Sequence, residues 1–222
     1  MLVITIITSL ISIFLMARDM ELHKDMYGIE DDTVKTKRIF SCKVIAYCIT
    51  MMIITILVGV LFCTLYKDNS IWISIKRMTL LSVLWPIAYI DAKTYRIPNL
   101  FIVCGLVYRV IIMLFELIFD NKGKWFELRG EIIAAFALLL AAVLCAVVIK
   151  NSVGFGDMKL FFLMGMMLGL DGIWSAIFLS LLISFVVSVF LLATKKKTRK
   201  DAIPFGPALV IGTYLSIGLT GM

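Results

Sequence analysis

Apolar runs long enough to cross a membrane recur along this chain, and no other feature limits its possible folds so strongly. The first run is MLVITIITSLISIFLMA, and comparable runs follow up to the C-terminal end. A helix needs about 20 such residues to cross roughly 30 Å of hydrocarbon. Only 17% of the 222 residues are charged, whereas a soluble domain carries about a quarter. The chain is therefore predicted to be an all-α, polytopic membrane protein.

The runs predict about eight membrane-spanning helices, of which the sixth is unusually short. A helix of that length covers only about 21 Å, so the glycine-containing segment before it is expected to dip into the bilayer inside a cleft. The dipeptide Asp171-Gly172 is expected to turn the chain after it. The predicted spans are 2–17, 44–66, 72–90, 99–119, 131–149, 157–170, 173–193 and 204–221.

Lysines and arginines predict how these spans are oriented. One set of loops (18–43, 91–98, 150–159 and 194–200) carries fifteen of them, and the opposite set carries six. Cytoplasmic loops are the more basic ones, so the first set is predicted to face the cytoplasm in a multi-pass inner-membrane protein. The net charge of +7 is then explained by loop orientation beside lipid, and we expect no nucleic-acid partner.

Two aspartates at the ends of apolar runs are predicted to lie at one membrane boundary. Asp91 ends the run that contains Pro86, and Asp157 follows two glycines in NSVGFGDMKLFF. Two predicted spans separate these acids, and an even number of crossings returns the chain to the same face. Two further crossings bring the stretch IPFGPAL, residues 203–209, to that face as well.

Two carboxylates in a cleft of low dielectric constant rarely ionise together, so one of them keeps a proton. Such a pair can hydrolyse an amide by general acid–base chemistry without a covalent intermediate. The residues alone leave two other interpretations open. Asp157 could cap its helix while Asp91 marks a span boundary, or both could serve a proton-coupled transporter.

Arg109 and Glu116 lie inside the fourth predicted span. Residues seven apart on a helix are separated by about 10 Å, so no direct ion pair is expected between them. Each is expected to need another partner or a watery groove.

Three segments together resemble the type IV prepilin peptidases, which are membrane aspartyl proteases with a Gly-x-Gly-Asp motif. They are DAKTYRIPN (91–99), GFGDMK (154–159) and IPFGP (203–207). The same motif is distantly similar to those of presenilin and the preflagellin peptidases. The resemblance covers about residues 72–221 and implies a six-helix catalytic domain over 72–222. Residues 1–71 are then two N-terminal membrane helices joined by a cytoplasmic loop.

The resemblance implies an aspartic endopeptidase that cuts the basic leader from pilin or pseudopilin precursors at the cytoplasmic face, in pilus or secretion systems. Its catalytic residues would be Asp91 and Asp157, and no metal or other cofactor is implied. An archaeal-type preflagellin peptidase, a transporter and a non-catalytic assembly scaffold are the alternatives. Supporting or substrate-binding roles would fall on Gly154, Gly156, Lys159, Pro98, Asn99, Pro204, Phe205, Gly206 and Pro207.

One departure from the family pattern concerns the loop between the first two predicted spans. Many bacterial members carry two CxxC pairs there and also N-methylate the processed pilin. Here residues 18–43 contain a single cysteine, Cys42. We therefore expect a peptidase without a zinc-supported loop and without methyltransferase activity. The acids of this loop are expected to be part of a solvated polar segment.

Overall fold

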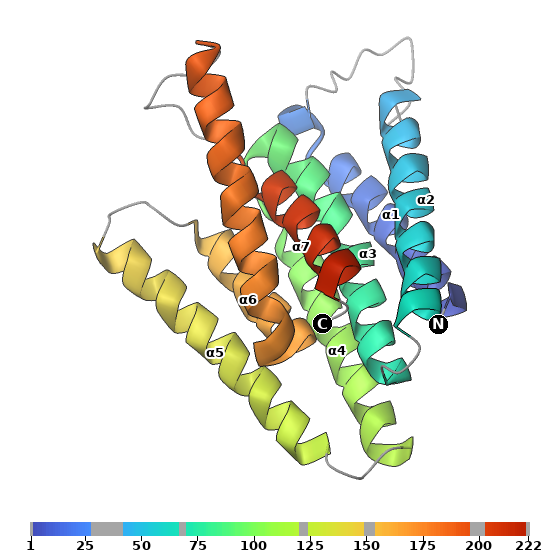
Figure 1. Ribbon diagram of the computed structural model, residues 1–222. Coiled ribbons are helices and arrows are strands. Elements are labelled where there is room, and N and C mark those ends of the chain that lie inside the picture. The colour runs from blue at the N-terminus through green and yellow to red at the C-terminus, as the bar shows by residue number, and fades with distance from the viewer. Residues whose placement is uncertain are drawn as a thin grey trace.

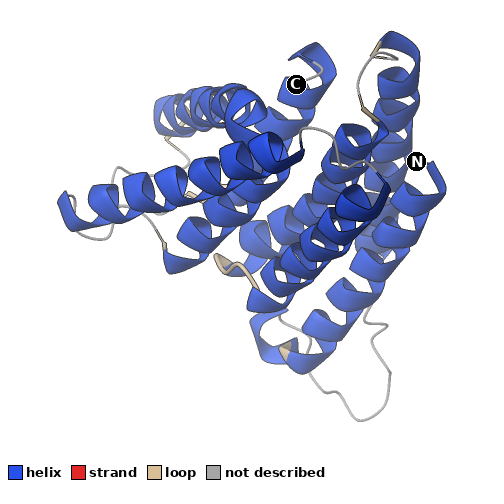
Figure 2. Ribbon diagram, turned by 90° about the horizontal axis from the view of Figure 1, so that it is seen from below, coloured by secondary structure: helices blue, strands red, loops and turns tan. Residues whose placement is uncertain are grey.

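The computed structural model describes residues 2–27, 42–66, 70–119, 124–148, 154–195 and 203–220. These residues form seven α-helices and a short 3-10 helix, and no strand occurs among them (Figure 2). Six of the α-helices are long and apolar enough to cross a membrane, which confirms the all-α, polytopic prediction. The helices are α1 (Leu2–Leu22), η1 (Lys24–Tyr27), α2 (Cys42–Leu65), α3 (Ile71–Thr94), α4 (Asn99–Phe119), α5 (Lys124–Val148), α6 (Phe155–Ala193) and α7 (Gly206–Thr220).

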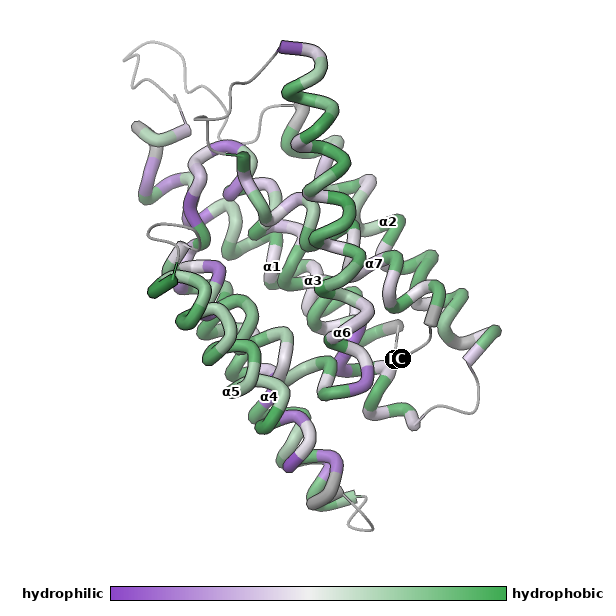
Figure 3. The backbone as a smooth tube through the Cα atoms, turned by 60° about the vertical axis from the view of Figure 1, so that its left-hand side comes forward, coloured by the Kyte–Doolittle hydropathy of each residue, from purple (hydrophilic) through white to green (hydrophobic). Residues whose placement is uncertain are grey.

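Helix α3 is the central element of the bundle. It is buried almost continuously from Ser74 to Asp91 and contacts α1, α2, α4, α6 and α7. Its mean hydropathy is 1.3, whereas α2, α5 and α6 reach 2.7, 2.7 and 2.8. The outer helices are more apolar because their exposed sides are suited to lipid, while α3 is enclosed by protein and can carry polar groups. In Figure 3 the outer helices are green along most of their length.

Helix α6 consists of two legs, because Gly169 has the non-helical angles φ 67° and ψ −174°. The chain reverses direction there, so residues 155–168 and 170–193 run side by side in opposite senses (Figure 1). The legs correspond to the sixth and seventh predicted spans. The turn was expected at Asp171-Gly172, but it occurs at Gly169, where only glycine adopts a positive φ without strain.

The predicted last span is a shorter helix than expected. Helix α7 has 15 residues, and at 1.5 Å per residue it covers about 22 Å. It packs mainly on α6 and α3. The C-terminal end of α3 and the N-terminal ends of α4, the first leg of α6 and α7 lie towards one end of the bundle, which we call the acid end (Figure 1).

Helix α5 packs chiefly on α6, through a stripe of buried residues spaced three or four apart. This stripe contains Leu128, Glu131, Ala135, Leu138 and Ala142. Gly165 of the first leg lies so close that a Cβ built there would be 2.5 Å from Cα of Ala135. Small residues allow this close approach of two membrane helices.

The contact at Gly165 gives a prediction about stability. In Gly165→Ala the new methyl group collides with the backbone of α5, so we expect destabilisation by about 1–3 kcal/mol. In the matched control Gly218→Ala, no atom lies within 4 Å of the new Cβ, and the better helix propensity of alanine is expected to leave stability equal or slightly higher. Thermal unfolding of the two variants in the same detergent tests this. Equal melting temperatures would contradict the packing described here.

Candidate active site

Asp91 lies in the last turn of α3, with its side chain turned towards the start of α7. The residue is 6% exposed, and its carboxylate Oδ2 accepts a hydrogen bond of 2.8 Å from the backbone N–H of Gly206. Helix α3 ends directly afterwards at Tyr95, which has left-handed backbone angles and donates its N–H to the carbonyl of Asp91. The carboxylate therefore faces the N-terminus of α7, where unpaired N–H groups favour negative charge.

The segment before α7 has the residues that this contact requires. A Cβ on Gly206 would lie 2.8 Å from Oδ2 of Asp91, so any larger residue would displace the carboxylate. Pro207 follows in the first helical turn, where the missing N–H costs nothing. The carbonyl of Phe205 accepts the N–H of Leu209 at 3.0 Å, and this bond starts the helix.

Asp157 occupies the first turn of α6, at the third helical position after the N-cap residue Gly154. Its carboxylate turns back over the N-cap, because a Cβ on Gly154 would lie 3.1 Å from Oδ2 of Asp157. An acid three residues after the N-cap is where a carboxylate best offsets the unpaired N–H groups. Asp157 is partly exposed, unlike Asp91.

Gly156, the second glycine of the motif, packs against the segment that follows α3. A Cβ on Gly156 would lie 3.0 Å from Cβ of Ile97. The loop after Asp91 therefore rests directly on the turn that carries Asp157. Sequence reasoning missed Ile97, since an apolar residue between Arg96 and Pro98 gives no chemical signal of its own.

These contacts bring the two acids together. The carboxyl groups of Asp91 and Asp157 are close enough to interact electrostatically, although 66 positions separate them in the sequence. Two carboxyl groups so placed, one buried and one partly exposed, can share a proton and act on a water molecule between them. The arrangement fits general acid–base hydrolysis.

The remaining residues singled out in the sequence surround this pair in different ways. Nζ of Lys159 donates a hydrogen bond of 2.9 Å to Oδ1 of Asn99, which links α6 to the start of α4. The same ammonium lies 4.8 Å from the centre of the Phe155 ring. Pro98 is buried and Pro204 is half-buried. The ring of Phe205 packs edge to face on Phe161 of α6, with 5.9 Å between the ring centres.

An apolar groove of about 490 Å³ begins beside this site. Asn99 and Lys159 lie at its start, and its floor includes Phe162 of the first leg of α6. Its walls come from α4 and α5, which make almost no direct contact with each other over their described residues. In Figure 1 these two helices diverge towards the acid end. The other residues that line the groove are Ile102, Val103, Leu106, Phe136 and Leu139.

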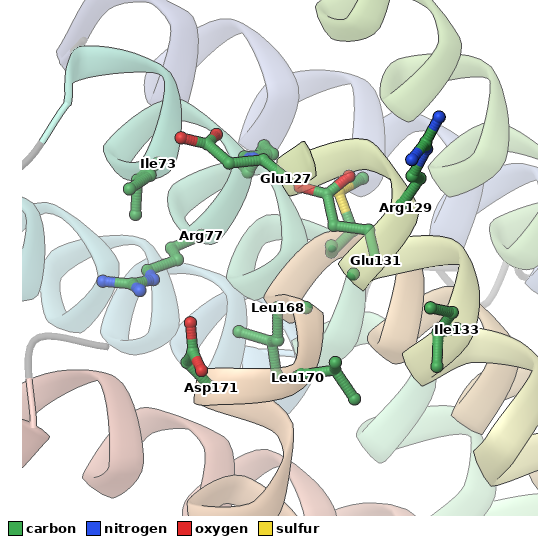
Figure 4. A pocket seen from close by; sticks show the side chains of 13 residues that line it. Ile73, Arg77, Glu127, Arg129, Glu131, Ile133, Leu168, Leu170 and Asp171 are labelled. Atoms are coloured by element: carbon green, nitrogen blue, oxygen red, sulfur yellow. The ribbon is translucent and has the colours of Figure 1, made fainter. Parts of the chain in front are cut away.

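A second pocket, of about 530 Å³, lies away from the two acids, around the turn of α6. Figure 4 shows Arg77 of α3, Glu131 of α5 and Asp171 of α6 around it. Behind it, Arg109 and Glu116 form a direct ion pair, with 3.2 Å between Nη1 and Oε2. The expectation that seven residues would keep this pair apart was wrong, because the long arginine side chain spans the gap along the helix.

The fold and these contacts define a polytopic helical membrane protein with paired aspartates at one end of the bundle. Residues 78–193 match the model of the type IV leader peptidase family. The matched region covers more than half of the chain and includes both Asp91 and Asp157. The chain therefore belongs to the type IV leader peptidase family, which confirms the resemblance seen in the sequence.

Three curated relatives share one name. The chain is 29% identical over 136 residues to the prepilin leader peptidase/N-methyltransferase of Bacillus subtilis (strain 168), covering 61% of this chain and 52% of that protein. It is 28% identical over 169 residues to the protein of that name from Neisseria gonorrhoeae, covering 73% and 55%. The chain thus spans about half the length of the curated relatives it matches. No solved structure matches it.

The contact between Ile97 and Gly156 predicts a disulfide. Cysteines at both positions would have their Cβ atoms about 3 Å apart, so a shift of about half an ångström would bring them into the ordinary range for a bridge. We expect mild oxidation of Ile97→Cys/Gly156→Cys to link the two segments, as read by mass spectrometry after thiol alkylation. The pair Ile97→Cys/Phe155→Cys is the control, since Phe155 is exposed. Equal yields from the two pairs would contradict the assembled site.

Proposed function

We propose that this chain is an aspartic endopeptidase that removes the leader from prepilin-like precursors. The observation that carries the proposal is the proximity of Asp91 and Asp157, which reach one end of the bundle from α3 and α6, where the loop after Asp91 packs through Ile97 on Gly156. Membership of the type IV leader peptidase family supports it. The relatives are named as prepilin leader peptidases, and the precursors of pilins or pseudopilins are therefore the proposed substrates.

The pair of acids would hydrolyse the peptide bond with water as the nucleophile. One carboxylate takes a proton from the water molecule while the water oxygen bonds to the scissile carbonyl carbon. The other carboxyl group, which is protonated, donates its proton to the carbonyl oxygen. The tetrahedral intermediate then collapses, the carbon–nitrogen bond breaks, and a proton passes to the leaving amine. Both carboxylates face helix N-termini, so the helix dipole favours neither as the base, and the pair acts as a unit.

We place the acid end at the cytoplasmic face of the inner membrane. The excess of lysine and arginine in the loops at that end, fifteen against six, supports this orientation. A basic leader would then be cut where it emerges from the membrane surface.

The apolar groove is the proposed seat of the substrate's apolar segment on the side of the scissile bond that enters the membrane. It is continuous with the site through Lys159, two residues after Asp157. Asn99 and Leu106 lie seven residues apart along α4, so the groove extends about 10 Å into the bundle. Two turns of an apolar helix would fit that length.

We also propose that the chain lacks methyltransferase activity. The relatives' names include N-methyltransferase, but residues 18–43 of this chain have no CxxC pair. Residues 28–41 of that loop lie outside the described part of the structure. The peptidase proposal also includes the division of the chain into two N-terminal membrane helices over residues 1–71 and a catalytic domain over residues 72–222.

The acids give the decisive test. In Asp91→Asn and Asp157→Asn one carboxylate can no longer exchange a proton, so we expect cleavage of a co-expressed precursor to fall at least about a hundredfold. Asp171→Asn, the same change at an exposed acid at the start of the second leg of α6, is the matched control and should cleave normally. Gel mobility and precursor mass measure the leader and any added methyl group. Wild-type cleavage by either active-site variant, at equal membrane levels, would refute the two-acid mechanism.

The groove gives a separate test. An indole in Leu139→Trp would fill the groove, and we expect KM for the precursor to rise about tenfold, or ~1.4 kcal/mol, with kcat unchanged. Leu140→Trp points the same side chain outward, because Leu140 is largely exposed, and should leave KM unchanged. Equal KM values for the two variants would contradict the groove as the seat of the substrate.

A further inference from the structure

Four charged side chains form a closed cluster at the end of the bundle opposite the two acids. They are Lys76 of α3, Arg109 and Glu116 of α4, and Glu131 of α5, each no more than 4% exposed. Each cation contacts both carboxylates. Nζ of Lys76 lies 2.5 Å from Glu131 and 3.3 Å from Glu116, while Arg109 pairs with Glu116 and, through Nη2, with Glu131. We call these four residues the charge cluster.

Stability alone is a poor explanation for such a cluster. Moving charges out of water costs several kcal/mol per ion, and well-packed apolar residues often replace buried ion pairs without loss. In a membrane helix charged residues are rarer still and mark a specific requirement. The cluster has no excess charge, with two cations and two carboxylates, so we take the requirement to be one of geometry.

The geometry that the cluster controls is visible at the turn of α6. Gly169 interrupts the helix. The last carbonyl groups of the first leg therefore lack the backbone N–H groups that would donate to them from four residues later in a continuous helix. Nε of Arg109 donates a hydrogen bond of 3.0 Å to one of these, the carbonyl of Met166. A cation at the C-terminus of a helix is also favoured by the helix dipole. Arg109 therefore caps the leg from a neighbouring helix.

Two of the helices held by the cluster, α3 and the first leg of α6, carry a candidate catalytic acid at their other ends. Met166 lies nine residues after Asp157 on the first leg, about 14 Å along the axis, and Lys76 lies fifteen residues before Asp91 on α3, about 22 Å away. A helix is stiff over such lengths, so fixing one end sets the axial register of the other.

We propose that the charge cluster is a positioning device that fixes the registers of α3 and the first leg of α6, and thereby the separation of Asp91 and Asp157. The proposal rests on the proposed peptidase function for its effect on rate, but not for its effect on geometry. None of the four residues touches the reacting atoms, so all of them act through the two acids. A misplacement of about 1 Å at a reacting group can lower a rate about a hundredfold.

Arg109→Lys is the primary test, because lysine keeps the charge but cannot cap Met166 while contacting both carboxylates. In the full chain, in membranes, we expect kcat to fall between about tenfold and a hundredfold with KM within about threefold. Arg129→Lys, the same change at an exposed position of α5 at that end of the bundle, is the matched control and should keep the wild-type kcat. Glu116→Gln, a milder isosteric change, provides a second variant if Arg109→Lys does not fold.

A geometric readout separates this proposal from the proposed function. In the Ile97→Cys/Gly156→Cys background, Arg109→Lys is expected to slow disulfide formation between the two segments at least about threefold, while Arg129→Lys leaves it unchanged. This readout decides the proposal even if the wild type cleaves no precursor. An unchanged disulfide rate would overturn the proposal, whatever happens to kcat. The proposal would also be overturned if Arg109→Lys lost activity only because less of it reached the membrane, and the folded protein had the wild-type kcat.

Discussion

The structure depends on the need to pair the polar groups of a helix that is enclosed on every side. No water is available in the hydrocarbon region, so buried polar groups must find partners within the protein. Helix α3 carries Lys76 near one end and Asp91 near the other, both buried. Glu116 and Glu131 meet the first, and the backbone N–H of Gly206 meets the second. The positions of α4, α5 and α7 around α3 follow from these partners.

The three sequence segments that resemble the family are, in physical terms, a single set of contacts. The first supplies Asp91 and Ile97, and the third supplies the N–H that Asp91 accepts. The second supplies Gly156, whose missing side chain lets Ile97 rest on the turn of Asp157. Glycine is needed most at 206, where a Cβ would lie 2.8 Å from the carboxylate of Asp91, whereas at 156 a Cβ 3.0 Å from Cβ of Ile97 would require only a small shift of the neighbouring segment.

Much of this could be predicted from the sequence. The length of an apolar run indicates a membrane span, and an even number of spans between two residues places them on the same face. The span positions, the all-helical class and the shared end of the two acids required only a bilayer thickness and a count of crossings. The turn in α6 was misplaced because Gly169 and Gly172 both permit a reversal, and periodicity does not choose between them.

Other features required side-chain geometry that no sequence pattern contains. The Arg109–Glu116 pair was excluded because only the rise of the backbone was considered, whereas an arginine adds several ångströms of reach. The meeting of Lys76 with Glu131 joins α3 to α5 across 55 positions, and neither residue stands in a recognisable motif. Ile97 was missed because it acts only by packing against Gly156, and an apolar residue in a loop gives no chemical signal in the sequence.

The packing of α5 has a consequence for how the molecule can respond to what it holds. Helix α5 is pinned near its start by Glu131 and otherwise rests chiefly on α6. Moving its far end outward would therefore cost one helix interface, while the contacts of α3 with α1, α4 and α7 would stay intact. If the groove between α4 and α5 holds the substrate as proposed, a displacement of α5 would widen it for apolar segments of different bulk while the contacts that hold Asp91 and Asp157 stay in place.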